Sequence, residues 1–260
     1  MRLAALLLLI TSCLAAQDKS LSGPQLIAGA KAGKPKGSLI IRARMEQETN
    51  GQRTNVINVQ IKRRSTAEGK GDQLYQVTFS KNPEQKGAAL LLHTDARGFS
   101  GSVFTPGKGV RKLTAADRRL SVFGTDMTVD DVLADFLNWT RHDIIGREKM
   151  QGNACAVIES KPASASSGIT KVKSWVEELR YIPWRVEIYE DGKDKPVRVE
   201  ETERVLRGSS GYWFPRQFTI STPAKGTTTK VEGTNSDTQE LTDADFTEAA
   251  MQRFGSAPVK

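Results

Sequence analysis

Apolar and polar residues alternate along much of the chain after residue 38, which predicts β-strands with one buried face. Leu39, Ile41, Ala43 and Met45 form one such run. Turn signals such as Thr49–Asn50–Gly51 separate successive runs about every ten residues. The pattern predicts an antiparallel meander, typical of a barrel or sandwich. The expected strands are residues 38–46, 57–62, 74–79, 88–93, 98–104, 110–113, 154–160, 170–177, 184–190, 196–206, 212–221 and 227–232.

One helical pattern interrupts these strands, between residues 120 and 139. Thr128 fits a helix N-cap, and Asp131, three residues later, fits the acidic partner of a capping box. An apolar stripe at helical spacing follows, formed by Val129, Val132, Leu133, Phe136 and Leu137. We therefore expect a short amphipathic helix whose apolar side faces the inside of the sheet.

Two further helices are expected near the ends of the chain. Residues 20–31 contain an apolar patch that ends before the Gly33–Gly37 breaker. Residues 243–254 form an amphipathic tail that can pack through Phe246, Ala250, Met251 and Phe254. No linker or internal repeat divides the chain, so residues 17–260 are expected to form one domain.

The first sixteen residues resemble a secretory signal peptide. A positive charge at Arg2 precedes a short apolar run, and small residues lead to Ala16. Residues 10–13 also resemble a lipobox, in which Cys13 would carry lipid. Cleavage near Ala16 is favoured over lipidation at Cys13, and both remain open. Either way, Cys155 is expected to be a buried core residue without a disulfide partner.

Charge and motifs exclude several function classes. The net charge of +8 comes from Lys and Arg scattered along strands and turns, and no nucleic-acid-binding motif is present. A solvated basic face is expected; attraction to an anionic membrane surface stays open. The two histidines, His93 and His142, have no neighbours at metal-ligand spacing, so neither a metal nor a cofactor is expected.

No catalytic constellation stands out in the sequence. The chain contains no Gly-x-Ser-x-Gly nucleophile motif. Asp126, Asp130 and Asp131 could form an acid–base cluster, but capping and turn formation explain them without chemistry. The sequence therefore predicts a protein that is not an enzyme.

Several segments, in this order, resemble the outer-membrane lipoprotein-sorting proteins of the LolA/LolB-like superfamily. The resemblance covers residues 38–254 and is carried by residues 77–79, 82–83, 86–92, 105–106, 110–113, 121–126, 130–133, 173–176, 182–189, 212–215 and 243–246. Residues 177–181 and the serine-rich loop 163–168 depart from the family pattern. The resemblance implies a mainly β fold with short helices. Its expected form is a curved, incompletely closed antiparallel β-barrel of about eleven strands, covered by helices on its concave face.

The same resemblance implies a periplasmic protein that carries lipoprotein acyl chains or other lipids in a hydrophobic cavity toward the outer membrane. The protein is expected to be a monomer. The alternative is a periplasmic sensor or scaffold that binds an inner- or outer-membrane protein partner. Aromatic side chains could belong either to the core or to the cavity wall, and Arg42 and Arg44 could hold a helical lid or point outward. The expected cavity residues are Leu39, Ile41, Met45, Ile57, Val59, Phe104, Phe123, Val132, Phe136, Val172, Val176, Trp184, Val186, Ile188, Phe214 and Phe218.

Overall fold

A computed structural model describes residues 20–32, 37–65, 70–163, 168–208, 211 and 213–253. The expected signal peptide, the expected lipidation site at Cys13 and the packing of Phe254 lie outside these residues. So do residues 33–36 of the expected breaker and residues 164–167 of the serine-rich loop.

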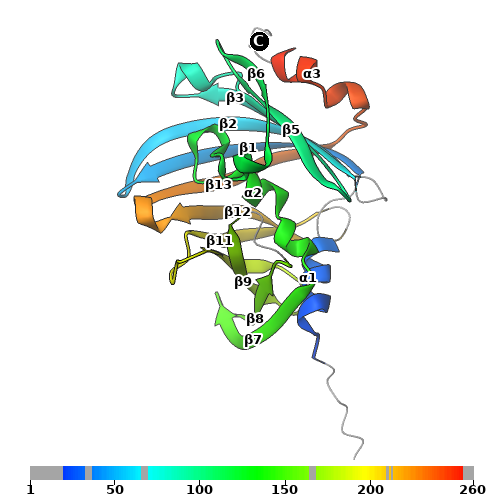
Figure 1. Ribbon diagram of the computed structural model, residues 1–260, viewed down its shortest axis with the longest axis vertical. Helices are drawn as coiled ribbons and strands as arrows, with labels where there is room; N and C mark the ends of the chain where they lie inside the picture. The colour runs from blue at the N-terminus through cyan, green and yellow to red at the C-terminus, as the bar shows by residue number, and fades with distance from the viewer. Residues whose placement is uncertain are drawn as a thin grey trace, which may run out of the picture.

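Thirteen strands form one antiparallel sheet in the described chain, in the order β6-β5-β4-β3-β2-β1-β13-β12-β11-β10-β9-β8-β7. The sheet curves strongly, and its end strands β6 and β7 do not pair with each other, so the barrel stays open (Figure 1). The predicted open, mainly β fold with short helices is confirmed. The strands are β1 Gly37–Thr49, β2 Gln52–Ser65, β3 Gly71–Ser80, β4 Ala89–Asp95, β5 Gly98–Thr105, β6 Gly109–Lys112, β7 Arg141–Met150, β8 Asn153–Lys161, β9 Ile169–Glu177, β10 Pro183–Glu190, β11 Arg198–Arg207, β12 Trp213–Thr222 and β13 Thr227–Thr238.

The strand absent from the sequence-based prediction is β7, an edge strand. Most of its residues are exposed or half-buried. Two apolar residues, Ile144 and Ile145, are consecutive in the sequence, so apolar and polar positions do not alternate regularly. A bulge between Ile144 and Gly146 absorbs the irregularity. An edge strand with polar outer positions gives a weak periodic signal.

The helical segments are short. They are α1 Gly23–Ala32, α2 Val129–Leu133 and α3 Glu248–Arg253, with the 3-10 turns η1 Pro83–Gln85, η2 Ala115–Arg119, η3 Val122–Gly124, η4 Asp135–Asn138, η5 Pro223–Lys225 and η6 Asp243–Asp245. No helix within the described ranges has the length and apolar character needed to cross a membrane.

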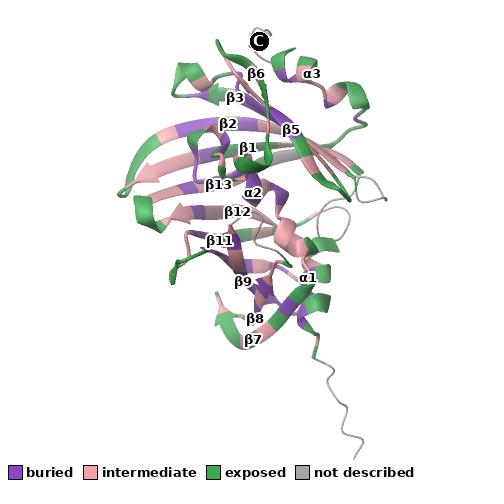
Figure 2. Ribbon diagram, viewed as in Figure 1, coloured by how far each residue is buried: buried purple, intermediate pink, exposed green. Residues whose placement is uncertain are grey.

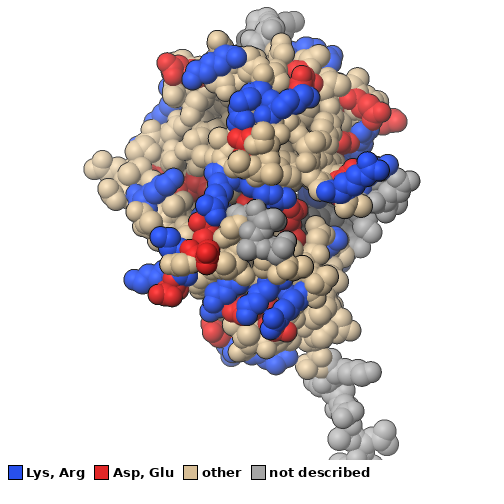
Figure 3. Space-filling model, in the orientation of Figure 1, with Lys and Arg blue, Asp and Glu red and all other residues tan. Residues whose placement is uncertain are grey.

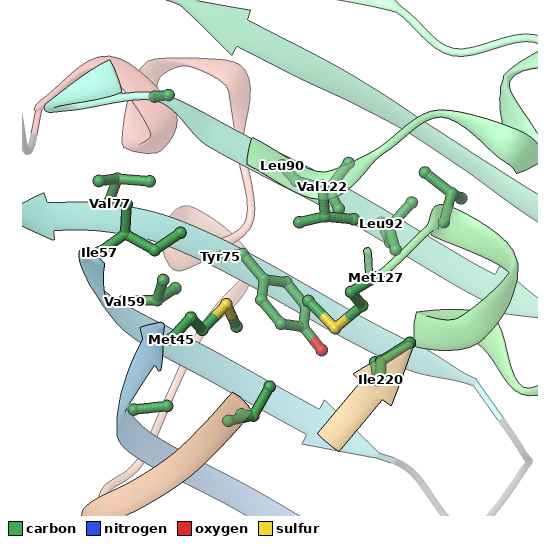
Figure 4. Close-up of a cluster of buried hydrophobic side chains, with 14 of the residues drawn as sticks. Met45, Ile57, Val59, Tyr75, Val77, Leu90, Leu92, Val122, Met127 and Ile220 are labelled. Carbon is green, nitrogen blue, oxygen red and sulfur yellow. The ribbon is translucent and has the colours of Figure 1, made fainter. Parts of the chain in front are cut away.

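The two faces of the sheet carry separate apolar clusters, because side chains alternate along each strand. On the concave face, Met45, Ile57, Val59, Tyr75 and neighbouring residues pack beneath residues 122–133 (Figure 4). The convex face carries Ile40, Leu74, Ala89 and Leu91, which pack against Leu241, Phe246, Ala250 and Met251 of the C-terminal segment. Buried stretches alternate with half-buried and exposed ones along the strands (Figure 2).

The expectation that the helices cover the concave face holds for α1 and α2, but α3 is an exception. Leu26 and Ile27 of α1 pack on Ala156, Ile158 and Val176. The C-terminal tail instead covers the convex face, where Gln76 donates a hydrogen bond from Nε2 to the carbonyl of Ala250 (3.1 Å). An amphipathic pattern reveals an apolar side but not the face of the sheet that receives it.

Candidate functional site

Residues 122–138, here called the plug, cross the concave face between the two halves of the sheet (Figure 1). Its helix α2 begins as predicted. Thr128 is the N-cap, and Asp131 accepts hydrogen bonds from both the backbone N–H and the hydroxyl of Thr128 (2.7 Å each). The expected single helix is wrong beyond Leu133, because Ala134 adopts a left-handed conformation (φ 49°) and the chain continues as the 3-10 turn η4. The apolar stripe is therefore split: Val129, Val132 and Leu133 pack on the concave cluster, and Phe136 and Leu137 pack on other clusters.

Ion pairs attach the plug to its surroundings. Asp131 accepts a hydrogen bond from Nε of Arg198 on β11 (3.1 Å), and both side chains are buried. Asp130 pairs with Arg118 of η2 (2.8 Å), and Arg118 also pairs with Asp135 (2.7 Å). These contacts and the capping box account for the carboxylates without acid–base chemistry.

The third aspartate of the expected cluster has a similar structural role. Asp126 accepts hydrogen bonds from the hydroxyls of Thr227 and Thr229 on β13, the latter at 2.8 Å. Its backbone N–H also donates to Thr229 Oγ1 (2.9 Å). Asp126 therefore ties the start of the plug to the middle strand of the sheet.

A cavity of about 860 Å³ lies between the plug, α1 and the concave face of the sheet. Its volume falls in the range of small-molecule and cofactor sites in proteins, about 300–1,000 Å³. Strands from both halves of the sheet contribute apolar walls. Phe136 of the plug and the adjacent Trp139 also line the cavity, and their rings contact each other edge to face (6.5 Å between ring centroids). The expected cavity residues that line it are Leu39, Ile41, Met45, Val132, Phe136, Val172, Val176, Val186, Ile188, Phe214 and Phe218.

The remaining expected residues do not line this cavity. Ile57 and Val59 are on the concave face, but the plug covers them and they are almost completely buried in the cluster of Figure 4. Phe123 packs on the same cluster from the plug itself. Phe104 packs on the convex face beside the C-terminal segment.

Trp184 lies on the opposite face from Val186, although strict alternation places them together. A bulge between Pro183 and Arg185 is the cause: Pro183 pairs with Val176 and Arg185 with Trp175, so one extra residue is inserted. Pro183 therefore lines the cavity, while Trp184 packs with Cys155 and Trp175. Its indole N–H donates to Glu177 (3.0 Å).

Sequence reasoning missed the polar part of the cavity wall. Arg63 and Gln73 line the cavity from neighbouring strands, next to Tyr75. Their signal was present in the sequence, since Arg63 follows Ile57, Val59 and Ile61 at the same two-residue spacing and so shares their face. Arg42 and Arg44, the arginines singled out from the sequence, instead point outward and pair with Asp237 and Glu46 (2.6 Å each).

The remaining polar groups weighed for chemistry have structural partners. His93 contacts Asp72 (2.7 Å) and His142 contacts Ser160 (2.8 Å). Cys155 is buried, and burial raises the pKa of its thiol to about 11. Within the described ranges, no group of three or more His, Cys, Asp or Glu residues is placed to hold a metal ion.

One face of the molecule carries surface charges of both signs (Figure 3). On the face shown in Figure 3, Lys and Arg side chains lie beside Asp and Glu side chains rather than in one uniform basic patch. The positive residues that give the net charge of +8 are therefore interspersed with acidic residues on this face (Figure 3).

A model of an "Uncharacterized protein"-like family matches residues 71–253, which is more than half of the chain. The chain belongs to this family. No curated protein matches it.

The chain shares its fold with several solved structures, among them a LolA superfamily protein. The chain is similar to a DUF1329 family protein from Desulfovibrio piger, with a TM-score of 0.79, 18% identity and coverage of 88% of this chain and 98% of the other. The chain is also similar to a putative outer membrane lipoprotein-sorting protein domain from Vibrio parahaemolyticus, with a TM-score of 0.79 and 19% identity. This match covers 89% of this chain and 98% of the other. A LolA superfamily protein from Nitrosomonas europaea matches with a TM-score of 0.69 and 16% identity, over 88% of this chain and 99% of the other. The LolA-like fold expected from the sequence is confirmed.

Proposed function

We propose that the protein is a periplasmic carrier that binds lipoprotein acyl chains, or other lipids, beneath the plug for transfer toward the outer membrane. The observation that carries this proposal is the apolar cavity of about 860 Å³ on the concave face. Its walls are mainly hydrophobic side chains from strands and plug, with polar groups at a few places. Such a site suits a ligand held by burial of apolar area, without any catalytic group.

The energetics favour an acyl chain as ligand. Each methylene moved from water into the cavity contributes about 0.8 kcal/mol, or about a fourfold gain in affinity. This gain does not depend on directional bonds, so chains of different origin can bind. It stops when the cavity is full, which gives the protein a preference for chain length.

The plug supplies a means of entry. Its first part packs into the buried cluster through Val129 and Leu133, whereas residues 134–138 are half-buried or exposed, and Asp135 pairs with Arg118. Exchange of that ion pair for water would allow residues 134–138 to move while the buried part of the plug and the sheet stay folded. The periplasmic location rests on the predicted signal peptide of residues 1–16, and the cavity calls for no metal or cofactor.

A chain-length series tests the proposal. Acyl glycerols of increasing length, kept below their micelle concentration, are titrated into the protein and the displacement of a fluorescent fatty-acid probe is measured. Affinity is expected to rise about fourfold per methylene and then level off. Affinity that does not change with chain length would refute the cavity mechanism, as would absence of binding.

Two variants of neighbouring residues on β1 provide the matched control. Ile41→Trp adds bulk inside the cavity, whereas Arg42→Trp adds the same side chain on the opposite, exposed face. Ile41→Trp is expected to shorten the optimal chain and lower affinity at least tenfold. Arg42→Trp is expected to bind like the unmodified protein.

A further inference from the structure

Arg63 on β2 stands apart from the other arginines that line the cavity. Arg118 pairs with two aspartates, and Arg216 donates from Nε to the carbonyl of Gly233 (3.1 Å). Arg63 has neither an ion pair nor a hydrogen bond from its side chain to any described residue. The adjacent Arg64, on the other face, pairs with Asp72 (2.7 Å) and Asp243 (2.6 Å). The guanidinium of Arg63, on the cavity side, therefore has no acidic partner, whereas that of Arg64 has two.

The strand register places further hydrogen-bonding groups beside Arg63. In the row across the sheet, Arg63 is opposite Gln73 of β3 and Leu39 of β1, and Leu39 is opposite Thr238 of β13. All four residues line the cavity. The hydroxyl of Tyr75 donates to Oε1 of Gln73 (3.0 Å), which leaves the Nε2 amide group of Gln73 as a donor. Donors therefore dominate this end of the cavity.

The surroundings of Arg63 do not neutralise its charge. Burial lowers the pKa of Arg63 from its ordinary value, while the pKa of the neighbouring Tyr75 is raised to about 12 by burial. Tyr75 therefore stays a neutral phenol near pH 7 and supplies no negative charge. A charged group in an apolar wall without a counter-charge is costly, so an anionic ligand there gains more than it would in water.

We propose that Arg63, assisted by Gln73, binds the anionic oxygen atoms of a lipid head, a carboxylate or a phosphate, while the acyl chain fills the cavity. This assignment rests on the proposed carrier function and narrows its cargo to an anionic amphiphile. A guanidinium offers a planar fork of donors that matches carboxylate and phosphate oxygens. An uncharged acylglycerol would leave that fork without its partner.

The geometry also sets the direction in which the ligand lies. Arg63 is near the end of β2, on the side of the sheet where β1 begins and β10 begins. Ile188 lies near the other end of β10, with Phe136 and Trp139 packed close to it. A lipid with its head at Arg63 therefore directs its chain past Ile41 toward this apolar cluster.

Four probes separate the possible sources of the anion. Lauric acid and lauroyl lysophosphatidic acid carry an acidic head, monolauroylglycerol carries the same chain with a neutral head, and inorganic phosphate has no chain. Binding to the full protein is measured by displacement of a fluorescent acyl probe. Both acidic lipids are expected to bind at least tenfold more tightly than monolauroylglycerol, and inorganic phosphate is expected not to compete.

Charge-removing variants assign that preference to the site. Arg63→Gln is expected to bring the acidic and neutral lipids to equal affinity, with little change for the neutral lipid. Arg42→Gln removes an equal charge from the outer face of the neighbouring strand and is expected to keep the preference. Circular dichroism and thermal melts of both variants establish that they are folded. Arg63→Gln without ligand should melt no lower than the unmodified protein, because no partner is lost.

Each contrary result overturns a distinct claim. Equal and tight binding of neutral and acidic lipids would refute the role of Arg63 and leave the carrier function standing. If Arg63→Gln still binds acidic lipids more tightly than the neutral lipid, the anion binds elsewhere, and the role of Arg63 is refuted as well. Competition by inorganic phosphate at the same concentration as the acidic lipids would show a free-anion site. Failure of all three lipids to bind would refute the carrier function and the anionic cargo together.

Discussion

Asp131 stabilises the plug through two separate contacts. Asp131 completes the capping box at Thr128 and is the hydrogen-bonded partner of Arg198 on β11, with both side chains more than nine-tenths buried. One Nη atom of Arg198 already has no hydrogen-bond partner among the described residues. Asp131→Ala therefore removes a helix cap and also leaves a buried guanidinium without its counter-charge. We expect a loss of about 3–5 kcal/mol in the free energy of unfolding, the usual cost of breaking a buried ion pair.

A companion variant separates the two contributions. Thr128→Ala removes the N-cap but leaves the ion pair in place, so it should cost only about 1 kcal/mol. The double variant Asp131→Leu with Arg198→Met should recover much of the loss, because replacing both ions leaves no unpaired charge. Urea denaturation followed by circular dichroism gives all three values. If Asp131→Ala and Thr128→Ala destabilise the protein equally, the ion pair does not hold the plug and the reasoning is refuted.

Two smaller predictions concern groups outside the cavity. Cys155 has a raised pKa of about 11 and is buried, so iodoacetamide at pH 8 should modify it only after unfolding in urea, as measured by peptide mass spectrometry; rapid labelling of the native protein would contradict its placement. The pKa of Asp245 is lowered by its hydrogen bond from Lys62 (2.6 Å) and by the backbone N–H of Thr242. The stability from this carboxylate is therefore present above its unfolded pKa of about 4 and is lost as pH falls through the lower folded value. Thermal melts from pH 5 to pH 2 should show this loss in the unmodified protein and a smaller one in Lys62→Met. Equal losses in the two proteins would refute the role of Lys62.

Local signals in the sequence were enough to predict much of the scaffold. The turn at Asn50–Gly51 has positive φ at both residues (50° and 77°), as a tight hairpin requires, and these residue types tolerate that conformation. The capping box of Thr128 and Asp131 spans four residues and forms as expected. Both features depend on contacts within a few residues, so their sequences specify them with little help from the rest of the fold.

Features that depend on distant contacts could not be predicted in this way. The bulge that turns Trp184 away from the cavity requires knowledge of its pairing with β9. The left-handed residue that ends α2 is Ala134, a residue type with no preference for that conformation. Its cost is offset by the surrounding contacts, which send Leu133 into the cluster under the plug and Phe136 toward the cavity. Residues that the sequence pattern assigns to one continuous apolar stripe therefore pack in two separate regions, the buried cluster and the cavity wall.

Ile41 and Ile57 show the same limit within the cavity and give a direct test of it. They are the same residue type, lie on the concave faces of the adjacent strands β1 and β2, and are indistinguishable by alternation. The plug covers Ile57, which is 1% exposed, whereas Ile41 is half-buried and borders the cavity. Ile57→Ala leaves a void among close-packed neighbours and should cost about 2–5 kcal/mol of unfolding free energy. Ile41→Ala enlarges a space that already exists, so it should cost clearly less and instead weaken acyl-chain binding several-fold. Denaturation and lipid titration of both variants compare the two effects. Equal destabilisation by both would mean that the concave face is a continuous core, with no cavity open to a ligand.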